Sequence, residues 1–524
     1  MWTSHPLSAW PGSLSSGLGG EWAGWTKKPD NSSFWPSDSR ERVFASLSQQ
    51  YVNAGITPPS SLAKLQVHST RVVTVGHQLV IAGGPSFFHH KILSAIRVAR
   101  RLSKGEEGTV VPLFWMASED HDWQEVSTLA GETDMHRWQP PEAVTPHPVG
   151  RRSLEGIEEM LAAWVEDLPD KAMAEDVVEE FQKALVNEEP LSGLMRRWLH
   201  RWYGEEGLLV LDADDPALKT SASQLWAAEF DGSGIHSVLR GSEEMEGPAH
   251  VRLNNVFWMD EDAGRHGVVK AVDSNLWEAG GVEVAKTHED WSVWSKANAA
   301  QCSPGVLLRP LYQEHLLHSL AVIVGPGEWG YWHQLPRVFE KFNMSFPSLR
   351  MRDHGVVLTL SVLQTGWSLA DGWMHSQEWD RWVLDRWLDE LGPALEKQQA
   401  ELLNWQQQQR EWIAHEAPML EGSAASFRAA VSKAWDQWLV KVRRSLKGSR
   451  AKEWAQAQLA HSSLVRDGKP QDRWANWHVL SQGNWRSWTQ AWLSDEVGAE
   501  AVVWTFVPTE VHIERTEQNS AKRN

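Results

Sequence analysis

An acidic cluster follows an apolar segment in "VVPLFWMASEDHDWQEV", residues 110–126. Glu119, Asp120, His121 and Asp122 place three carboxylates and one imidazole side by side. Such groups repel one another and lose hydration when buried, so some of them must meet a cation, a substrate amine or solvent. We predict catalytic roles for them, with His121, Asp120 or Asp122 as the base and Glu119 as its orienting partner. A solvated loop, or a helix capped by one of the aspartates, would explain the same residues.

Three other stretches offer binding groups. "GHQLVIAGGP" (76–85) has glycines that permit close backbone approach, and it precedes a helix whose unpaired N–H groups could bind an anion. Arg309 could hold a carboxylate or phosphate bidentately, and Glu314 or Glu328 could receive an amine. Arg309 could instead pair with a core acid. A metal held by His121 and its neighbouring aspartates would need further ligands from elsewhere in the chain.

The order of the strands and helices that must position these residues predicts a parallel sheet. Residues 71–76 are a β-branched strand, 85–102 have helical spacing, and 109–115 are a second apolar strand. This order is a right-handed βαβ unit. In an open parallel sheet, ligands bind beyond the carboxyl ends of the strands, where the loops converge. Further core strands are predicted at 207–214, 305–310, 319–327 and 501–508.

The segments between the strands predict an α/β protein in four parts. The core comprises 1–130 with 205–220, 300–372 and 466–524, a helical insertion covers 131–204, a β-containing insertion covers 221–299, and a helical domain covers 373–465. The spacing of apolar residues in the helical domain predicts an antiparallel pair of helices that is interrupted near Pro418. Its apolar seam comprises Leu402, Trp405, Trp412, Val431, Trp435, Trp438, Val442 and Leu446. The seam can close within one chain or on a second copy, so a hairpin and a homodimer both fit.

Composition limits the partners. The 524 residues carry a net charge of -18, which argues against a nucleic-acid or anionic-membrane surface. No signal peptide is evident, apolar runs fall far short of the roughly 20 residues of a membrane helix, and we expect a cytoplasmic protein. The single cysteine, Cys302, could be a covalent relay, but a buried, unreactive thiol is the favoured interpretation. The 34 tryptophans indicate packing.

Five motifs, in order along the chain, resemble those of one family. The matched residues are Gly76, Gln78, Gly84, Pro85 and Lys91; then Pro112, Phe114, Trp115, Ala117 and Glu119 to Asp122; then Ser303, Arg309, Pro310, Gln313 and Glu314; then Gly325, Gly327, Glu328, Tyr331 and Trp332; and finally Gln471, Asp472 and Arg473. On these residues the sequence resembles the BshC family, the cysteine-adding enzymes of bacillithiol biosynthesis. It departs from the family pattern at His77, Ser118 and Asp472, where Gln, Gly and Glu are usual.

The resemblance implies a Rossmann-like core with two connecting insertions and a helical coiled-coil domain. It implies a ligase that joins the carboxyl of cysteine to the amine of glucosaminyl malate. The substrate-binding residues would be Gly76, His77, Gln78, Gly84, Pro85, Lys91, Arg309, Gln313, Glu314, Gly325, Gly327, Glu328, Tyr331 and Trp332, with Gln471 and Arg473 as a further motif. Activation of the carboxyl would ordinarily use ATP with Mg²⁺, so the expected cofactor is ATP or ADP with Mg²⁺. A non-catalytic coiled-coil protein that binds nucleotides or metabolites of the same pathway is the alternative. A metal-dependent hydrolase is less favoured, because no second histidine cluster has ligand spacing.

Overall fold

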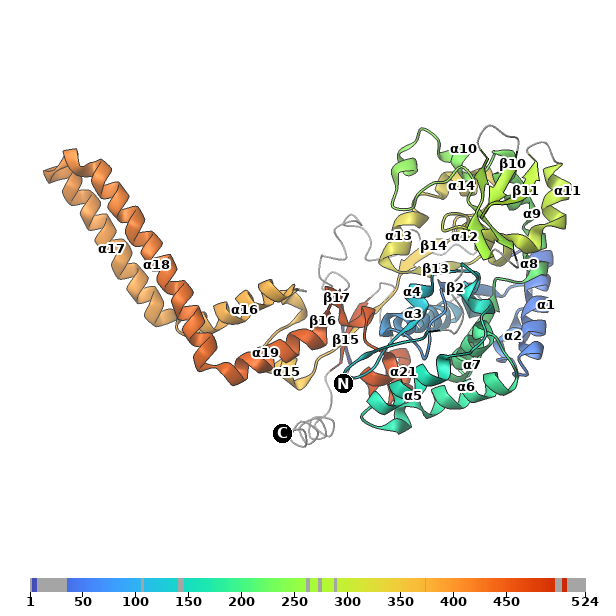
Figure 1. The fold of residues 1–524 in the computed structure, drawn as a ribbon, viewed down its shortest axis with the longest axis horizontal. Coiled ribbons are helices and arrows are strands. Elements are labelled where there is room, and N and C mark those ends of the chain that lie inside the picture. Colours follow the sequence, from blue (N-terminus) through green and yellow to red (C-terminus); the bar gives the residue numbers. More distant parts are fainter. Residues whose placement is uncertain are drawn as a thin grey trace. The chain divides into compact units, whose positions relative to one another are not determined.

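The computed structural model describes residues 2–6, 35–104, 108–139, 146–260, 264–271, 276–286, 290–372, 374–494 and 502–506. The described chain forms two compact units (Figure 1). An α/β unit comprises residues 2–356 with 472–506, and a helical unit comprises residues 357–471.

A five-stranded parallel sheet forms the centre of the α/β unit, which confirms the predicted fold class. Its order is β14-β13-β2-β3-β6, and Figure 1 labels the first three of these strands. The strands are β2 (Arg71–His77), β3 (Val110–Met116), β6 (Leu209–Asp212), β13 (Ala321–Val324) and β14 (Ser348–Met351). From β2 the chain adds β3 and β6 on one side, and it then returns to add β13 and β14 on the other. The topological switch point therefore lies between β2 and β13, where sheets of this kind bind ligands.

Helices cover both faces of this sheet. On β3, the Phe114 ring lies 5.7 Å from the Phe88 ring of α3, and the next residue, Trp115, lies 5.2 Å from Tyr312 of α12, measured between ring centroids. Successive strand residues point to opposite faces, so α3 and α12 cover opposite faces, with α1 packed beside α12. The three helices are α1 (Ser37–Asn53), α3 (Ser86–Ser103) and α12 (Leu308–Leu317). Burial on both sides explains the nearly continuous apolar runs of β2 and β3.

The predicted core strand at 305–310 is wrong. The short strand β12 (Cys302–Pro304) pairs with β7 (Val256–Asp260), outside the core sheet, and helix α12 follows it. Periodicity alone cannot assign so short an apolar run to strand or helix. Pro310 is compatible with the helix because it lies in the first turn, where backbone N–H groups have no partner within the helix.

Two further corrections concern β14 and β18. The prediction missed β14, because the charged residues around it conceal a strand whose four residues are all buried. The predicted core strand at 501–508 exists as β18 (Val502–Phe506), but it belongs to a separate sheet of order β1-β18-β15. Its neighbours are β1 (Trp2–Pro6) and β15 (His354–Val357).

The first connection is mainly helical, and the second contains both helices and β-strands. The first carries α4 (Trp123–Val126), β4 (Thr128–Ala130), β5 (Met135–Arg137), α5 (Ile157–Asp167), α6 (Glu175–Val186) and α7 (Leu191–Tyr203). The second carries α8 (Pro216–Ser221), α9 (Ser223–Asp231), α10 (Ile235–Leu239), β7, β8 (Gly264–Gly267), β9 (Val269–Lys270), β10 (Leu276–Ala279), β11 (Val282–Lys286), α11 (Trp291–Ala297) and β12. Elsewhere in the unit lie α2 (Ser61–Lys64), α13 (Pro326–Trp332), α14 (Pro336–Lys341), α20 (Trp477–Ser481) and α21 (Trp485–Ser494).

The helical unit confirms the predicted helical pair, α17 and α18, with its break at Pro418. Trp412 and Trp438 are 52% and 42% exposed, so they are not part of the seam that is buried within one chain. Leu439, one helical turn beyond Trp435, is half-buried in their place. The unit comprises α15 (Leu360–Thr365), α16 (Ser376–Asp389), α17 (Gly392–Glu416), α18 (Glu421–Ser449), α19 (Ala451–Leu464), β16 (Val465–Arg466) and β17 (Lys469–Pro470).

Candidate functional site

Buried Lys91 and partly exposed Glu328 form an ion pair beside the switch point. Lys91 lies on α3, which follows β2, and Glu328 lies in the first turn of α13, which follows β13. The Lys91 ammonium also donates to the carbonyl oxygen of Gly76 at 2.5 Å. The backbone N–H of Gly325 donates to Glu328 at 2.9 Å. The pair therefore joins the two strand ends that flank the switch point.

Arg309, in the first turn of α12, brings a second cation to the same carboxylate. Its Nη2 lies 3.3 Å from Oε1 of Glu328 and donates to the hydroxyl of Tyr331, while Nη1 donates to Gln313 at 2.7 Å. Gly76 permits this approach, because a Cβ there would lie 3.2 Å from Nη1. Much of the guanidinium is used inside the protein, so Arg309 orients Glu328 and Tyr331 and leaves only part of itself for a ligand.

The loop after β2 carries His77 and Gln78 to this edge. The side-chain amide of Gln78 donates to Asp120 at 2.5 Å. The His77 ring packs against Phe87, and its Nδ1 lies 2.9 Å from the carbonyl oxygen of Gln78. Burial, together with the nearby charge of Lys91, lowers the pKa of His77 to about 4. His77 is therefore neutral at pH 7.

Gly84 and Pro85 turn the chain into α3. Gly84 has a φ of 52°, in the left-handed region that favours glycine, and a Cβ there would lie 2.8 Å from that of Val80. The backbone N–H of Ser86 donates to Ala475 at 2.8 Å. Part of the helix N-terminus predicted to bind an anion is thus already occupied by the chain itself.

The late motif supplies a second ion pair near α3. Asp472 is buried and lies 2.9 Å from Arg352 and 3.3 Å from Nδ1 of His354. The Arg473 and Arg352 guanidinium carbons lie 5.1 and 5.2 Å from the centroid of the Phe87 ring. The motif thus gathers two arginines around one carboxylate and one aromatic ring.

Asp120 and His121 share a buried cation, Arg265 of β8. Oδ1 of Asp120 accepts the backbone N–H of His121 at 2.7 Å and lies 3.6 Å from Nη1 of Arg265. The same Nη1 lies 2.7 Å from Nδ1 of His121. The side chains of Asp120 and His121 are 33% and 34% exposed, so both remain within reach of a ligand. We call Gly76, Gln78, Lys91, Asp120, His121, Arg309 and Glu328 the switch-point site.

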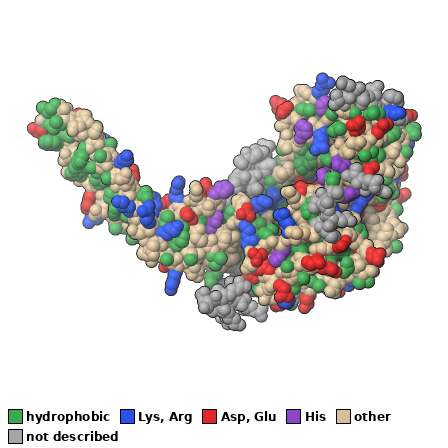
Figure 2. Space-filling view, in the orientation of Figure 1, with side chains coloured by type: hydrophobic (Ala, Val, Ile, Leu, Met, Phe, Trp, Pro, Cys, Tyr) green, Lys and Arg blue, Asp and Glu red, His purple; other side chains and the backbone are tan. Residues whose placement is uncertain are grey.

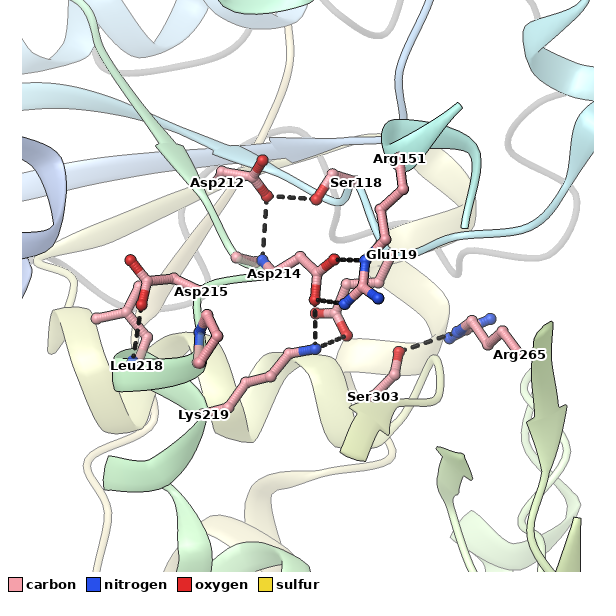
Figure 3. A network of polar contacts seen from close by, with 12 residues as sticks. Ser118, Glu119, Arg151, Asp212, Asp214, Asp215, Leu218, Lys219, Arg265 and Ser303 are labelled. Carbon is pink, nitrogen blue, oxygen red and sulfur yellow. Dashed lines mark hydrogen bonds and ion pairs between the residues drawn. The ribbon is translucent and has the colours of Figure 1, made fainter. Parts of the chain in front are cut away.

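Glu119 belongs instead to a closed ionic network (Figure 3). Its carboxylate lies 3.0 Å from Nζ of Lys219, which also lies 2.6 Å from Asp214. Arg151 donates twice to Asp214, at 2.5 and 2.8 Å. The Lys219 side chain is fully buried, so the two carboxylates neutralise a cation that solvent cannot reach. The prediction that Glu119 directly orients His121 is therefore corrected, because Glu119 reaches that ring through Ser303 and Arg265.

Asp122 and Glu314 also lie outside the switch-point site. Asp122 is exposed and caps α4 by accepting the backbone N–H of Glu125 at 3.4 Å, so the capping alternative is confirmed for this residue. Glu314 is buried and accepts the backbone N–H and the hydroxyl of Ser319 at 2.8 and 2.9 Å. It ties α12 to the start of β13 rather than meeting a ligand.

Three other residues of the predicted site, Trp332, Gly327 and Gln471, also lie outside the switch-point site. Trp332 is fully buried and packs against Phe339. Gly327 is exposed, and a Cβ there would meet nothing within 4 Å. Gln471 belongs to the helical unit, where it donates to and accepts from the backbone of Val357. The contacts of Trp332 and Gln471 explain these two residues without a ligand, and Gly327 makes no contact that requires glycine.

Neighbouring cations keep the two carboxylates of the switch-point site, Glu328 and Asp120, ionised. Burial raises the pKa of Glu328, but Lys91 and Arg309 outweigh this effect and leave the pKa below its ordinary value. Burial also raises the pKa of Asp120, but Arg265 and the Gln78 amide outweigh this effect. The pKa of Asp120 therefore also lies below its ordinary value. Both carboxylates are charged at neutral pH, so they can bind an amine or hold a cation.

Sequence reasoning missed Arg265, Lys219 and Arg352. Each is a buried cation that meets a carboxylate 100 or more residues away in the sequence, and Lys219 also meets Asp214. Other charged residues lie near all three in the sequence, so only their burial, which requires a partner, distinguishes them.

Cys302 is buried in β12, which confirms the predicted buried thiol, and burial raises the pKa of the thiol to about 12 and so disfavours the reactive thiolate. Within the described ranges, no cluster of three or more His, Cys, Asp or Glu side chains is placed to bind a metal ion. None of the described helices is long and apolar enough to cross a membrane.

A doubly wound parallel sheet with charged groups from several distant segments at its switch point defines a Rossmann-like α/β protein with a polar small-molecule site. Residues 23–353 match the family model described as "Bacillithiol biosynthesis BshC, N-terminal Rossmann-like domain". The chain belongs to this family, which confirms the resemblance.

Relatives named "Putative cysteine ligase BshC" are similar over much of the chain. The Flavobacterium johnsoniae protein is 27% identical over 63% of each chain, and the Geobacillus thermodenitrificans protein is 28% identical over 82% of each. The Cytophaga hutchinsonii protein is 30% identical over 57% of this chain and 56% of its own. The match to the Flavobacterium protein spans less than two thirds of that protein's length.

Proposed function

We propose that this chain is a carbon–nitrogen ligase that joins the carboxyl of cysteine to the amine of glucosaminyl malate, giving bacillithiol. The observation that carries the proposal is the gathering of Lys91, Asp120, Arg309 and Glu328, from four segments, at the switch point of the sheet. Membership of the BshC family and the printed names of the relatives support the choice of reaction.

Positive charge would hold the malate carboxylates. Glu328 and Asp472 each face two cations, so cations outnumber carboxylates around α3 and α13. Arg309 and Arg473 are the partly exposed members of this set. A guanidinium binds a carboxylate or a phosphate through paired hydrogen bonds, so these two arginines are the contacts we assign to the anionic end of the substrate.

Asp120 is the group to which we assign the amine proton. It is ionised and partly exposed, and it accepts a hydrogen bond from Gln78 in the loop after β2. The attacking nitrogen becomes more acidic as its bond to the carbonyl carbon forms, so a carboxylate within hydrogen-bond reach can accept the proton. Asp120 could also hold the amine in place before attack.

The cysteine carboxyl must be activated, and ATP with Mg²⁺ is the means that we propose. The excess of cations at the site is compatible with phosphate groups. The described residues present no preformed cluster of metal ligands. The chain's own share in holding Mg²⁺ would thus be small beside phosphate oxygens and water, as is usual for this ion.

We also propose that a second copy of the chain binds through α17 and α18. Figure 2 shows hydrophobic side chains grouped on this helical pair. Among them, Trp412 is 52% exposed, Met419 82% and Phe427 56%. An exposed apolar patch of this kind marks an interaction surface, and a two-fold symmetric dimer would cover it with the same surface of the partner.

The ligase proposal is tested with purified full-length chain, cysteine, glucosaminyl malate, ATP and Mg²⁺, with bacillithiol measured by mass spectrometry. We expect product that depends on ATP. Binding of glucosaminyl malate in calorimetry without product at any protein concentration would overturn the proposal and favour the non-catalytic metabolite-binding protein.

A further inference from the structure

Arg265 is held on three sides within the α/β unit. Its Nε donates to the hydroxyl of Ser303 at 2.9 Å, and its Nη2 donates to the carbonyl oxygen of Pro304 at 2.9 Å. The guanidinium carbon lies 3.9 Å from the centroid of the Phe257 ring. These contacts fix the plane of the guanidinium, so its remaining nitrogen, Nη1, is held in one direction.

Nη1 of Arg265 lies 2.7 Å from Nδ1 of His121, and this contact determines the form of the imidazole. A guanidinium can only donate hydrogen bonds and does not lose its proton in proteins. Nδ1 must therefore be the acceptor and carry no hydrogen. A neutral imidazole has one N–H group, so the hydrogen of His121 is on Nε2.

We propose that Arg265 is a positioning residue that holds His121 as a hydrogen-bond donor through Nε2, for the oxyanion that forms on the cysteine carbonyl during ligation. This inference rests on the proposed function. In the step, the amine nitrogen attacks the activated carbonyl carbon, the carbon–nitrogen bond forms, and the bond to the leaving group then breaks. The proton of the amine passes to Asp120, while the negative charge on the carbonyl oxygen is stabilised by the His121 N–H.

The surroundings of His121 support this assignment. The charged and titratable groups around the ring are Asp120 and Asp122 on its own loop, and Arg265 and His266 on β8; the Phe257 ring lies 5.7 Å away. Burial and the charge of Arg265 lower the pKa of His121, against the opposing effect of the aspartates. Neutral histidine can stabilise developing negative charge while a carboxylate acts as the base, a division of roles known in other enzymes.

The first test reads the imidazole directly and does not depend on activity. In full-length protein with ¹⁵N-labelled histidine rings, the His121 signals are assigned by their loss in His121→Gln. We expect a neutral ring with hydrogen on Nε2 at pH 7. A protonated ring, or hydrogen on Nδ1, would overturn the inference. If the chain makes no bacillithiol, the proposed function fails, and this measurement still decides the arrangement of Arg265 and His121.

The second test separates a donor from a base by kinetics. Removal of one oxyanion donor costs roughly 100- to 1000-fold in kcat, and we expect a loss of this order in His121→Ala. His121→Gln retains an N–H donor but no basic nitrogen, so it should recover at least tenfold of that loss. Equal activity of the two variants would show that His121 acts as a base, contrary to the inference.

The third test addresses Arg265 itself. Arg265→Met should lower kcat at least tenfold with little change in KM, and it should move the His121 titration upward. Arg265→Lys should restore part of both effects. Arg252→Met is the matched control, because it removes the other guanidinium near the Phe257 ring and leaves the Arg265–His121 hydrogen bond in place. An unchanged His121 titration in folded Arg265→Met would contradict the inference; where that variant does not fold, the wild-type ring measurement decides.

Discussion

Glu119 and Asp120 are neighbours in sequence, yet they lie in opposite kinds of environment. Glu119 is buried in a network with Lys219, where each charge has a partner and no ligand is required (Figure 3). Asp120 is one third exposed and shares its cation, Arg265, with an imidazole. The first region resembles the inside of a protein and the second a binding site. The comparison shows that a charge cluster in a sequence can divide into a structural part and a functional part at a single peptide bond.

The physical reason is the end of β3. Both residues lie in the turn that follows β3, where Glu119 meets Lys219 of α8 and Asp120 meets Gln78 of the loop after β2. Desolvation then requires a full counter-charge for the buried group and only a partial one for the exposed group.

Breaking the closed network should have the largest effect. Lys219→Met leaves Glu119 and Asp214 buried without their shared cation, and removal of one partner from a buried ion pair costs about 3–5 kcal/mol. Urea unfolding should show this loss in the free energy of unfolding. Lys171→Met, which removes a surface ion pair with Glu166, should cost about 1 kcal/mol or less. Equal losses in the two variants would remove the distinction between the regions.

Changing the open carboxylate should affect activity rather than folding. Asp120→Asn should lower kcat by about 100- to 10,000-fold, the usual range for loss of proton transfer, with little change in the urea midpoint. Asp122→Asn is the matched control, because asparagine caps a helix as well as aspartate does. Similar kcat values for the two variants would exclude Asp120 as the proton acceptor.

The same contrast recurs on α3, where neutral His90 precedes charged Lys91. Burial lowers the pKa of His90 to about 3, below the value of about 6.5 for an unfolded histidine. As the pH falls below 6.5, the unfolded chain binds a proton that the folded chain does not, so stability falls. His90→Gln should reduce the loss of unfolding free energy between pH 7 and pH 5 by about 2 kcal/mol. Urea unfolding at both pH values checks this, and an unchanged pH dependence would mean that His90 titrates normally.

The smallest effect on folding is expected in the helical unit. Trp412→Ser with Trp438→Ser should change the unfolding free energy by about 0.5 kcal/mol or less, because both rings are substantially exposed. If these rings form the dimer contact, the dissociation constant of the dimer, measured by sedimentation, should increase at least tenfold. Leu459→Ser, at an exposed position on α19, serves as the control. A monomeric wild-type chain would refute the proposed dimer.

Much of the framework could be predicted because it is encoded locally. Apolar runs closed by glycine or by charges predicted β2, β3, β6 and β13, and helical spacing predicted α3 and the pair broken at Pro418. The edge of the sheet that gathers Gly76, Gln78 and Asp120 followed from the parallel order of these strands. Local patterns were ambiguous for α12 and concealed β14, because short or charge-bearing segments carry little periodicity.

By itself, therefore, the sequence determined the order of strands and helices, the family, and the set of polar residues that come to the strand ends. Only the tertiary structure decided which of them are paired away and which remain open. Arg265 meets His121 across 144 residues, and its partners in the second connection give no local sign of the contact. Once burial has removed water, the distance between two charged groups in space decides whether they pair. The spacing of residues along the sequence does not give that distance.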